Sequence, residues 1–246
     1  MDKELKKIVY SAFFPFLFVF VLWIIKGIEL YFELDFSDFG ILPLNAKGLR
    51  GVIFSPLLHG DLKHLMSNTA PLLVLGWGLF YFYRRIAYPV FFLSWLITGI
   101  WVWAFARENF HIGASTIVYS LAAFHIASAL IRREKSVLAF MLLVFFLYGS
   151  MIWGFFPDFF PNRNISWEGH LMGSLAGIVL AVFYRKEGPQ RYVPDWEEDE
   201  EDDDELSDED PYWLIDDQQE EDPRNLNVRY RYHYRPSPKD KHSRNQ

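Results

Sequence analysis

Long apolar runs separated by short polar segments dominate the chain up to about residue 190. Six of them approach the roughly 20 apolar residues that are needed to cross about 30 Å of hydrocarbon. The runs cover residues 8–25, 62–83, 87–106, 115–131, 136–156 and 167–184. The pattern predicts an all-α membrane protein, a bundle of six transmembrane helices. The first run lacks a small-residue cleavage site, so we expect a retained helix and not a cleaved signal peptide.

The positive charges indicate how these helices are oriented. With six spans, four basic clusters fall on the same side of the membrane. They are Lys3 with Lys6 and Lys7, Arg84 with Arg85, Arg132 with Arg133 and Lys135, and Arg185 with Lys186. Because positive charge marks the cytoplasmic side, we expect both termini in the cytoplasm. The predicted location is the cell (inner) membrane, with the lipid bilayer as the surrounding partner.

The charge balance divides the chain into two predicted domains. Residues 1–190 carry 16 Lys and Arg against 12 Asp and Glu, whereas residues 191–246 carry 8 against 19. An acidic block that cannot bury a core is typical of disorder. We therefore predict a membrane domain over residues 1–186 and a disordered cytoplasmic tail, acidic and then basic and aromatic, over 187–246. The acidic pI describes this tail and not the membrane domain, so it supports no inference about partners. We expect no nucleic-acid partner.

The segments between and within the spans differ in expected packing. Residues 29–57 alternate acidic and aromatic side chains, which predicts a hairpin at headgroup depth. The fifth span is almost unbroken Leu, Phe, Val and Met, so we expect a peripheral, lipid-exposed helix. Gly169, Gly173 and Gly177 recur every four residues on the sixth span, and small residues allow helices to approach closely in lipid. The expected partner is the fourth span.

Polar side chains recur at one depth, where the second, fourth and sixth spans begin. His64 and Asn68 are one turn apart on the second span, and Ser115 and His170 open the fourth and sixth. Polar residues inside a membrane are costly and indicate function. Acyl transfer needs a nucleophile, a base and donors for an oxyanion. Ser115 as nucleophile, His170 as general base, and His64 with Asn68 as oxyanion donors would supply them.

Structural alternatives exist for each of these side chains. Ser115 is also a suitable N-cap for the fourth span, and His170 is also a suitable core histidine bonded to a backbone carbonyl. His59 and His64 fit the surface of an amphipathic segment before the second span. His125 suits core packing and His111 a loop. A zinc site made by His59, His64 and His170 lacks a carboxylate at ligand spacing, so we predict no metal and no other cofactor.

Taken together, these residues resemble the rhomboid intramembrane serine proteases over residues 5–185. The matching motifs lie in order on spans two, four and six, and are His59-x4-His64-x3-Asn68, Gly113-Ala114-Ser115-Thr116 followed by Tyr119, and Gly169-His170-x2-Gly173-x3-Gly177. Arg50 resembles the family's Trp-Arg element in the first outer loop. Two departures are Thr116, where the family usually has glycine, and Leu49, where it often has tryptophan.

The resemblance implies a serine endopeptidase that uses a dyad of Ser115 and His170. His64 and Asn68 would line the oxyanion site, Tyr119 would stack on the catalytic histidine, and His59 would support them. The expected partners are single-span membrane proteins, which reach the site laterally between spans two and five and are cleaved near the outer end of their helix. No pattern in the chain fixes an oligomeric state. An inactive rhomboid-like protein that binds membrane helices is the alternative, and a proton-coupled transporter is a third hypothesis, without an inverted repeat to support it.

Overall fold

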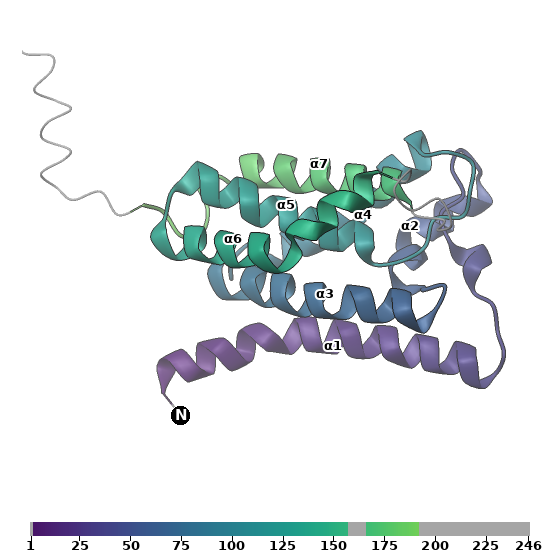
Figure 1. Ribbon diagram of the computed structural model, residues 1–246, viewed down its shortest axis with the longest axis horizontal. Coiled ribbons are helices and arrows are strands. Elements are labelled where there is room, and N and C mark those ends of the chain that lie inside the picture. The colour runs from purple at the N-terminus through teal and green to yellow at the C-terminus, as the bar shows by residue number, and fades with distance from the viewer. Residues whose placement is uncertain (1, 157–165, 192–246) are drawn as a thin grey trace, which may run out of the picture. The chain divides into compact units, whose positions relative to one another are not determined.

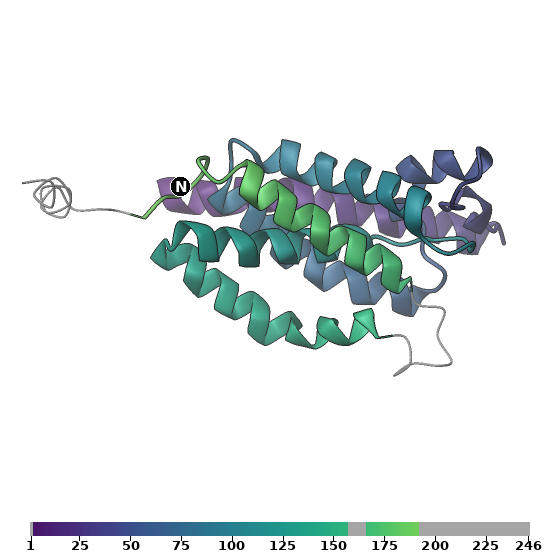
Figure 2. The same cartoon turned by 90° about the horizontal axis from the view of Figure 1, so that it is seen from above.

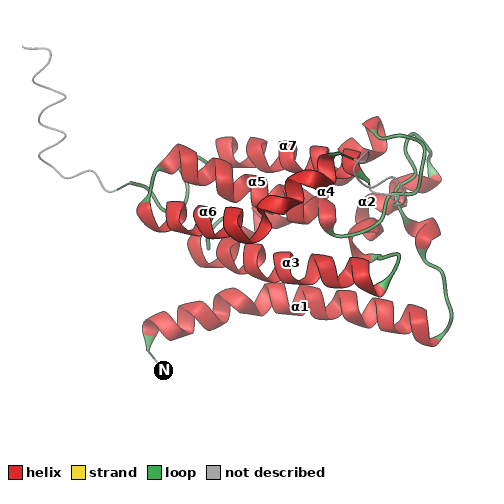
Figure 3. Ribbon diagram, viewed as in Figure 1, coloured by secondary structure: helices red, strands yellow, loops and turns green. Residues whose placement is uncertain are grey.

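The computed structural model describes residues 2–156 and 166–191, which form an all-helical bundle (Figures 1 and 3). The long helices are α1 (Lys3–Tyr31), α3 (Leu62–Phe82), α4 (Ala87–Phe105), α5 (Ser115–Arg132), α6 (Lys135–Tyr148) and α7 (Trp167–Phe183). The described residues contain no strand, and one isolated bridge pairs Ile41 with His111. The predicted all-α membrane bundle is confirmed. The predicted tail lies, from residue 192 onward, outside the described residues.

The helices differ in whether they can span a membrane alone. Within the described residues, α1, α3, α4 and α5 are long and apolar enough to do so, whereas α6 and α7 are apolar but have 14 and 17 residues. The single helix predicted over 136–156 is wrong in its second part, because α6 continues as a 3-10 helix, η4 (Gly149–Phe155). Two glycines in η4 weaken the α-helix there. A 3-10 helix rises about 2.0 Å per residue, so the segment still covers the length of a span.

Successive helices run in opposite directions, which gives the bundle two unlike ends (Figures 1 and 2). The helices α3, α5 and α7 begin at the end that contains Ser115, which we call the serine end. They finish at the other end, where α1 begins, which we call the arginine end. The four basic clusters identified in the sequence flank the helix termini at the arginine end. That this end faces the cytoplasm stays a prediction.

The closest helix pair in the bundle is α5 and α7, as the glycine spacing predicts. A Cβ added at Gly173 would overlap the carbonyl oxygen of Thr116, and one added at Gly177 would overlap that of Ser120. The glycine face of α7 therefore lies directly on the backbone of α5. In lipid, such close approach supplies the van der Waals contact that associates helices. It also brings the first turns of α5 and α7 together at the serine end.

Helices α3 and α4 are tied to α5 by buried polar contacts. Ser120 Oγ donates to Ser94 Oγ of α4 over 2.8 Å, and His125 Nε2 lies 2.9 Å from the Leu75 carbonyl of α3. His125 is fully buried, in agreement with its predicted packing role. Polar groups inside a membrane domain need such partners because no water is present to replace them.

The loop between α1 and α3 is folded into a series of short helical turns and is not a simple hairpin. Residues 29–31 of the predicted hairpin belong to the end of α1, and the rest forms short helical turns: η1 (Ser37–Phe39), η2 (Lys47–Arg50), α2 (Gly51–Phe54) and η3 (Ser55–Leu57). Indole N–H groups of α4 hold this loop, because Trp95 donates to the Val52 carbonyl (2.9 Å) and Trp103 to the Asn45 carbonyl (3.0 Å). The prediction of a hairpin is therefore corrected to a folded loop docked on α4.

Candidate active site

Gly113 determines how the chain enters α5. Its φ of +113° is one that residues with a side chain rarely adopt, and an added Cβ would lie 2.7 Å from His64 Nε2. The Gly113 N–H donates to the Ser55 carbonyl over 2.8 Å, which fixes this turn against the loop before α3. The His64 ring thus packs on the backbone two residues before Ser115.

Ser115 is the first residue of α5, and its hydroxyl faces α7. Ser115 Oγ lies 3.2 Å from His170 Nε2. The alternative that Ser115 is the N-cap of the helix is wrong, because Ala114 occupies that position. The first N–H groups of a helix have no acceptor within it, so the backbone N–H of Ser115 is a donor beside its own hydroxyl.

The His170 ring is fixed by two further contacts. Its Nδ1 lies 2.8 Å from the carbonyl oxygen of Gly154 in η4. Its plane stacks on the Tyr119 ring, with centroids 4.0 Å apart and an angle of 10° between the planes. Because a carbonyl only accepts, Nδ1 carries the proton, and Nε2 presents its lone pair to Ser115. A neutral imidazole with this tautomer is the form that accepts a hydroxyl proton.

Gly154 is a site residue that the sequence did not indicate. A Cβ at this position would overlap Tyr119 Oη and lie 2.9 Å from His170 Nδ1, so only glycine lets η4 approach the stacked rings. In the sequence, Gly154 stands among apolar residues that were assigned to a continuous helix. A glycine within an apolar segment can mark a close approach of the backbone to another group, but nothing in the sequence indicates that this group is His170.

The oxyanion candidates lie at the start of α3. The side chain of Asp61 caps this helix by accepting from the His64 N–H over 2.7 Å. One turn later, Asn68 is 5% exposed, and its Nδ2 has no hydrogen-bond partner among the described residues. A buried donor without an acceptor is costly. Asn68 therefore has an unused N–H donor on the same helix face as His64.

His59 is buried, so the alternative that it lies on the surface of an amphipathic segment is wrong for this residue, whereas His64 is half-buried. His59 is 2% exposed, and its Nε2 accepts from the Ala114 N–H over 3.4 Å. Its ring meets the His64 ring edge to face, with centroids 5.1 Å apart. Burial lowers the pKa of His59 to about 3, with the nearby His64 adding to the shift, so the ring stays neutral and remains an acceptor.

Two small residues of α7 let it approach Ser115. A Cβ at Gly169 would lie 2.9 Å from Cγ2 of Thr116, and Gly173 lies against the Thr116 carbonyl. The methyl group of Thr116 therefore points at α7. This is the place where the family usually has glycine, and the extra bulk is accommodated against Gly169.

Known proteins resemble this chain over most of the bundle. The Rhomboid domain matches residues 46–187. An uncharacterized protein of Mycobacterium tuberculosis is 35% identical over 185 residues, which cover 71% of this chain and 74% of the relative. A putative rhomboid protein of Acanthamoeba polyphaga mimivirus is 24% identical over 156 residues, 58% of this chain and 81% of the relative. The chain belongs to the rhomboid family.

In this rhomboid, a second set of polar contacts holds the start of α7. His111, predicted as a loop residue, is buried; its Nδ1 lies 2.6 Å from Ser166 Oγ and its Nε2 3.0 Å from the Arg107 carbonyl. Burial lowers the pKa of His111. Glu168 pairs with Arg107 over 3.3 Å and therefore does not orient His170. The sequence showed these residues near the site but not their pairing.

Within the part of the rhomboid that the structure describes, the histidines of the zinc alternative are not arranged as a group of ligands. The described residues contain no group of three His, Cys, Asp or Glu side chains placed to hold a metal ion. His59 Nε2 faces the Ala114 N–H, and His170 Nε2 faces the Ser115 hydroxyl. Two of the three rings of the zinc alternative, those of His59 and His170, are thus each directed to a different partner.

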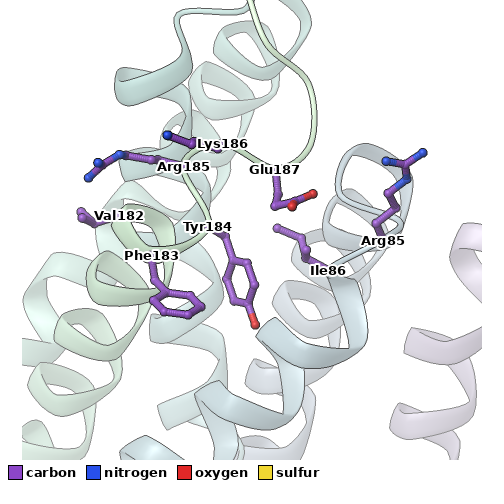
Figure 4. A pocket seen from close by; sticks show the side chains of 8 residues that line it. All are labelled: Arg85, Ile86, Val182, Phe183, Tyr184, Arg185, Lys186 and Glu187. Carbon is purple, nitrogen blue, oxygen red and sulfur yellow. The ribbon is translucent and has the colours of Figure 1, made fainter.

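A pocket of about 620 Å³ lies at the arginine end of the rhomboid, away from Ser115 (Figure 4). It is formed by Arg85 and Ile86 after α3 and by residues 182–187 at the end of α7. The guanidinium groups of Arg85 and Arg185 lie on opposite sides of it in Figure 4, so they do not converge on one ligand. Among the described residues, no serine, threonine or histidine lines the pocket, so it offers no nucleophile and base of the Ser115 and His170 kind. The serine end is therefore the candidate active site.

Proposed function

We propose that the protein is an intramembrane serine endopeptidase that cleaves single-span membrane proteins with a dyad of Ser115 and His170. The observation that carries this proposal is the 3.2 Å contact between Ser115 Oγ and the acceptor nitrogen of His170. Family membership supports the same class of reaction. The two groups come from helices whose backbones touch, so their geometry is set before a substrate binds.

In the first step, Ser115 Oγ attacks the carbonyl carbon of the scissile peptide as its proton passes to His170 Nε2. The carbonyl oxygen becomes an oxyanion, which the Ser115 N–H and side-chain donors of His64 and Asn68 stabilise. The imidazolium then gives its proton to the leaving amine as the C–N bond breaks. Water, deprotonated by the same nitrogen, hydrolyses the acyl-enzyme. Removing a single oxyanion donor costs about 3 kcal/mol in well-studied soluble enzymes.

The Gly154 carbonyl takes the orienting position that an aspartate holds in a catalytic triad. It fixes the tautomer of His170 through Nδ1 without a negative charge. The charged imidazolium formed during the reaction still benefits from this acceptor, because hydrogen bonds to a charged donor are stronger. Tyr119 limits rotation of the ring from one face.

The proposed substrate reaches the dyad laterally between α3 and α6. The contacts of α6 with α3 gather around Phe140, which packs on Trp77 and Phe82 toward the arginine end. Farther along α6, Leu142, Phe145 and Phe146 are exposed. With the arginine end in the cytoplasm, the cut would fall near the outer end of the substrate helix. That helix must unwind locally, because irregular backbone at this depth needs protein or water partners.

The alternative is an inactive rhomboid-like protein that binds membrane helices. Both the nucleophile and the base are present here and lie in hydrogen-bond reach, which favours the enzyme.

Two substitutions test the proposal. Ser115→Ala and His170→Ala should each abolish cleavage of a fluorescent transmembrane substrate in detergent, and Ser115→Ala should abolish labelling by a fluorophosphonate. Ser136→Ala, at the opposite end of the bundle, is the matched control and should cleave like the wild type. Thermal unfolding verifies that the variants are folded. Wild-type rates in either dyad variant would refute the dyad, and a wild-type protein that binds the substrate without cleaving it would favour the inactive binder.

A further inference from the structure

A buried lysine near the end of α1 is not explained by the proposed dyad. Lys26 is 6% exposed. Its ammonium group donates to Glu29 Oε2 (2.8 Å), to the His59 carbonyl (2.8 Å) and to the Gly60 carbonyl (3.1 Å). An ammonium group has three N–H donors, so all of them are used. In the sequence, Lys26 is only a single charge that follows an apolar run, which by itself indicates no chemistry.

Glu29 pairs with Lys26 through one carboxylate oxygen and binds the loop after α1 through the other. Its second oxygen, Oε1, accepts from the Phe36 N–H over 3.2 Å. Buried ion pairs are often replaceable by apolar side chains without loss of stability. A lysine in this position is therefore a costly way to attach α1 to the bundle, and its contacts indicate a more specific role.

The two carbonyls that Lys26 holds belong to the residues just before α3. One of them is His59, whose ring accepts from the Ala114 N–H and packs on the His64 ring. Ala114 precedes the proposed nucleophile, and His64 is a proposed oxyanion donor. Lys26 thus fixes the backbone of His59, whose ring contacts both the Ala114 N–H and the His64 ring beside the proposed oxyanion site.

We propose that Lys26 is a positioning residue, which acts through His59 to hold the Ser115 backbone N–H and the His64 side chain in place for the oxyanion. The inference rests on the proposed protease function. Lys26 does not touch the substrate. Without its ammonium group, the carbonyls of His59 and Gly60 lose a shared donor, and the loop before α3 gains freedom at the point where the oxyanion donors begin.

The test compares Lys26→Met with Leu22→Ala. Methionine keeps the length and apolar packing of the lysine chain but removes the donor. Leu22 is fully buried on the same helix, and its truncation loosens α1 while the hydrogen bonds from Lys26 to His59 and Gly60 keep their donor. We expect Lys26→Met to lower kcat by about tenfold or more at nearly unchanged KM, because a misplacement of about 1 Å can cost roughly a hundredfold. Leu22→Ala should lower the unfolding temperature and leave kcat within about twofold.

A second measurement does not depend on cleavage. Hydrogen exchange of the Ala114 amide and of residues 58–64 should be faster in Lys26→Met than in the wild type, and unchanged in Leu22→Ala. Equal kcat in Lys26→Met and wild type, or an equal loss of kcat in both variants, would overturn the positioning role. If the wild type neither cleaves nor reacts with a fluorophosphonate, the protease function fails instead. In that case only the exchange rates test whether Lys26 holds the loop before α3. Unchanged rates in Lys26→Met would overturn the positioning role.

Discussion

The His170 ring contacts the Ser115 hydroxyl on one side and the Gly154 carbonyl on the other, and these two groups belong to regions that differ in how closely they are packed. On one side, α7 lies on α5 through glycines that bring backbone against backbone, and α5 supplies the Ser115 hydroxyl. On the other side, η4 continues α6, a helix whose buried side chains are Val137, Phe140 and Val144, and it supplies the Gly154 carbonyl. The imidazole is therefore held between a close-packed helix pair and a segment with little packing.

This difference separates two requirements of catalysis within a membrane. In the proposed dyad, the nucleophile and base must keep a fixed distance, which backbone contact between α5 and α7 would provide. A substrate helix must also reach them, and a helix with few buried side chains opposes displacement less. The tautomer of His170 depends on the loosely packed side, so movement of η4 would change the base itself.

The largest effect should follow from disturbing the close-packed side. In Gly173→Ala, the new methyl group overlaps the Thr116 carbonyl, so α7 must move away from α5. Overpacking of this kind costs about 1–3 kcal/mol, which lowers the unfolding temperature by roughly 2–10 °C. Cleavage should fall to background because Ser115 and His170 separate. Thermal unfolding in detergent measures the loss of stability, and cleavage of the transmembrane substrate measures the loss of activity.

Gly27→Ala is the matched control, because an added Cβ there meets nothing within 4 Å. Its unfolding temperature should stay the same or rise, since alanine is the better helix former. If Gly173→Ala cleaves as fast as Gly27→Ala, the contact between α5 and α7 does not set the dyad.

The close-packed side was the part that the sequence predicted well. Glycines every four residues indicated the face of α7, and the shared depth of Ser115 and His170 placed them together. A bond from His170 to a backbone carbonyl was one alternative, but the sequence could not predict that Gly154 supplies it, because every residue carries the same carbonyl group. The sequence also missed Lys26, since a charge at the end of an apolar run is usual and its partners, the carbonyls of His59 and Gly60, are distant in the chain.

A smaller effect should follow from disturbing η4. In Gly154→Ala, the new methyl group overlaps Tyr119 Oη. We expect η4 to shift away from it, because α6, which η4 continues, has few buried side chains. The shift breaks the contact with His170 Nδ1. We expect kcat to fall by roughly tenfold to a hundredfold, which is part of the 10²–10⁴ that general base catalysis contributes, while the unfolding temperature changes little. A loss of stability as large as that of Gly173→Ala would show that η4 is packed as firmly as α7.

The smallest effect should come from the exposed face of α6. Phe146 is 85% exposed, so Phe146→Ala removes a ring that packs on little of the protein. Surface substitutions away from packed features usually change stability by less than about 0.5 kcal/mol. We therefore expect the unfolding temperature of Phe146→Ala in detergent to equal that of the wild type within about 2 °C, and fluorophosphonate labelling of Ser115 to proceed at the wild-type rate. A clear loss of stability would mean that this face of α6 is covered in the folded protein, and the contrast between the two sides of His170 would no longer hold.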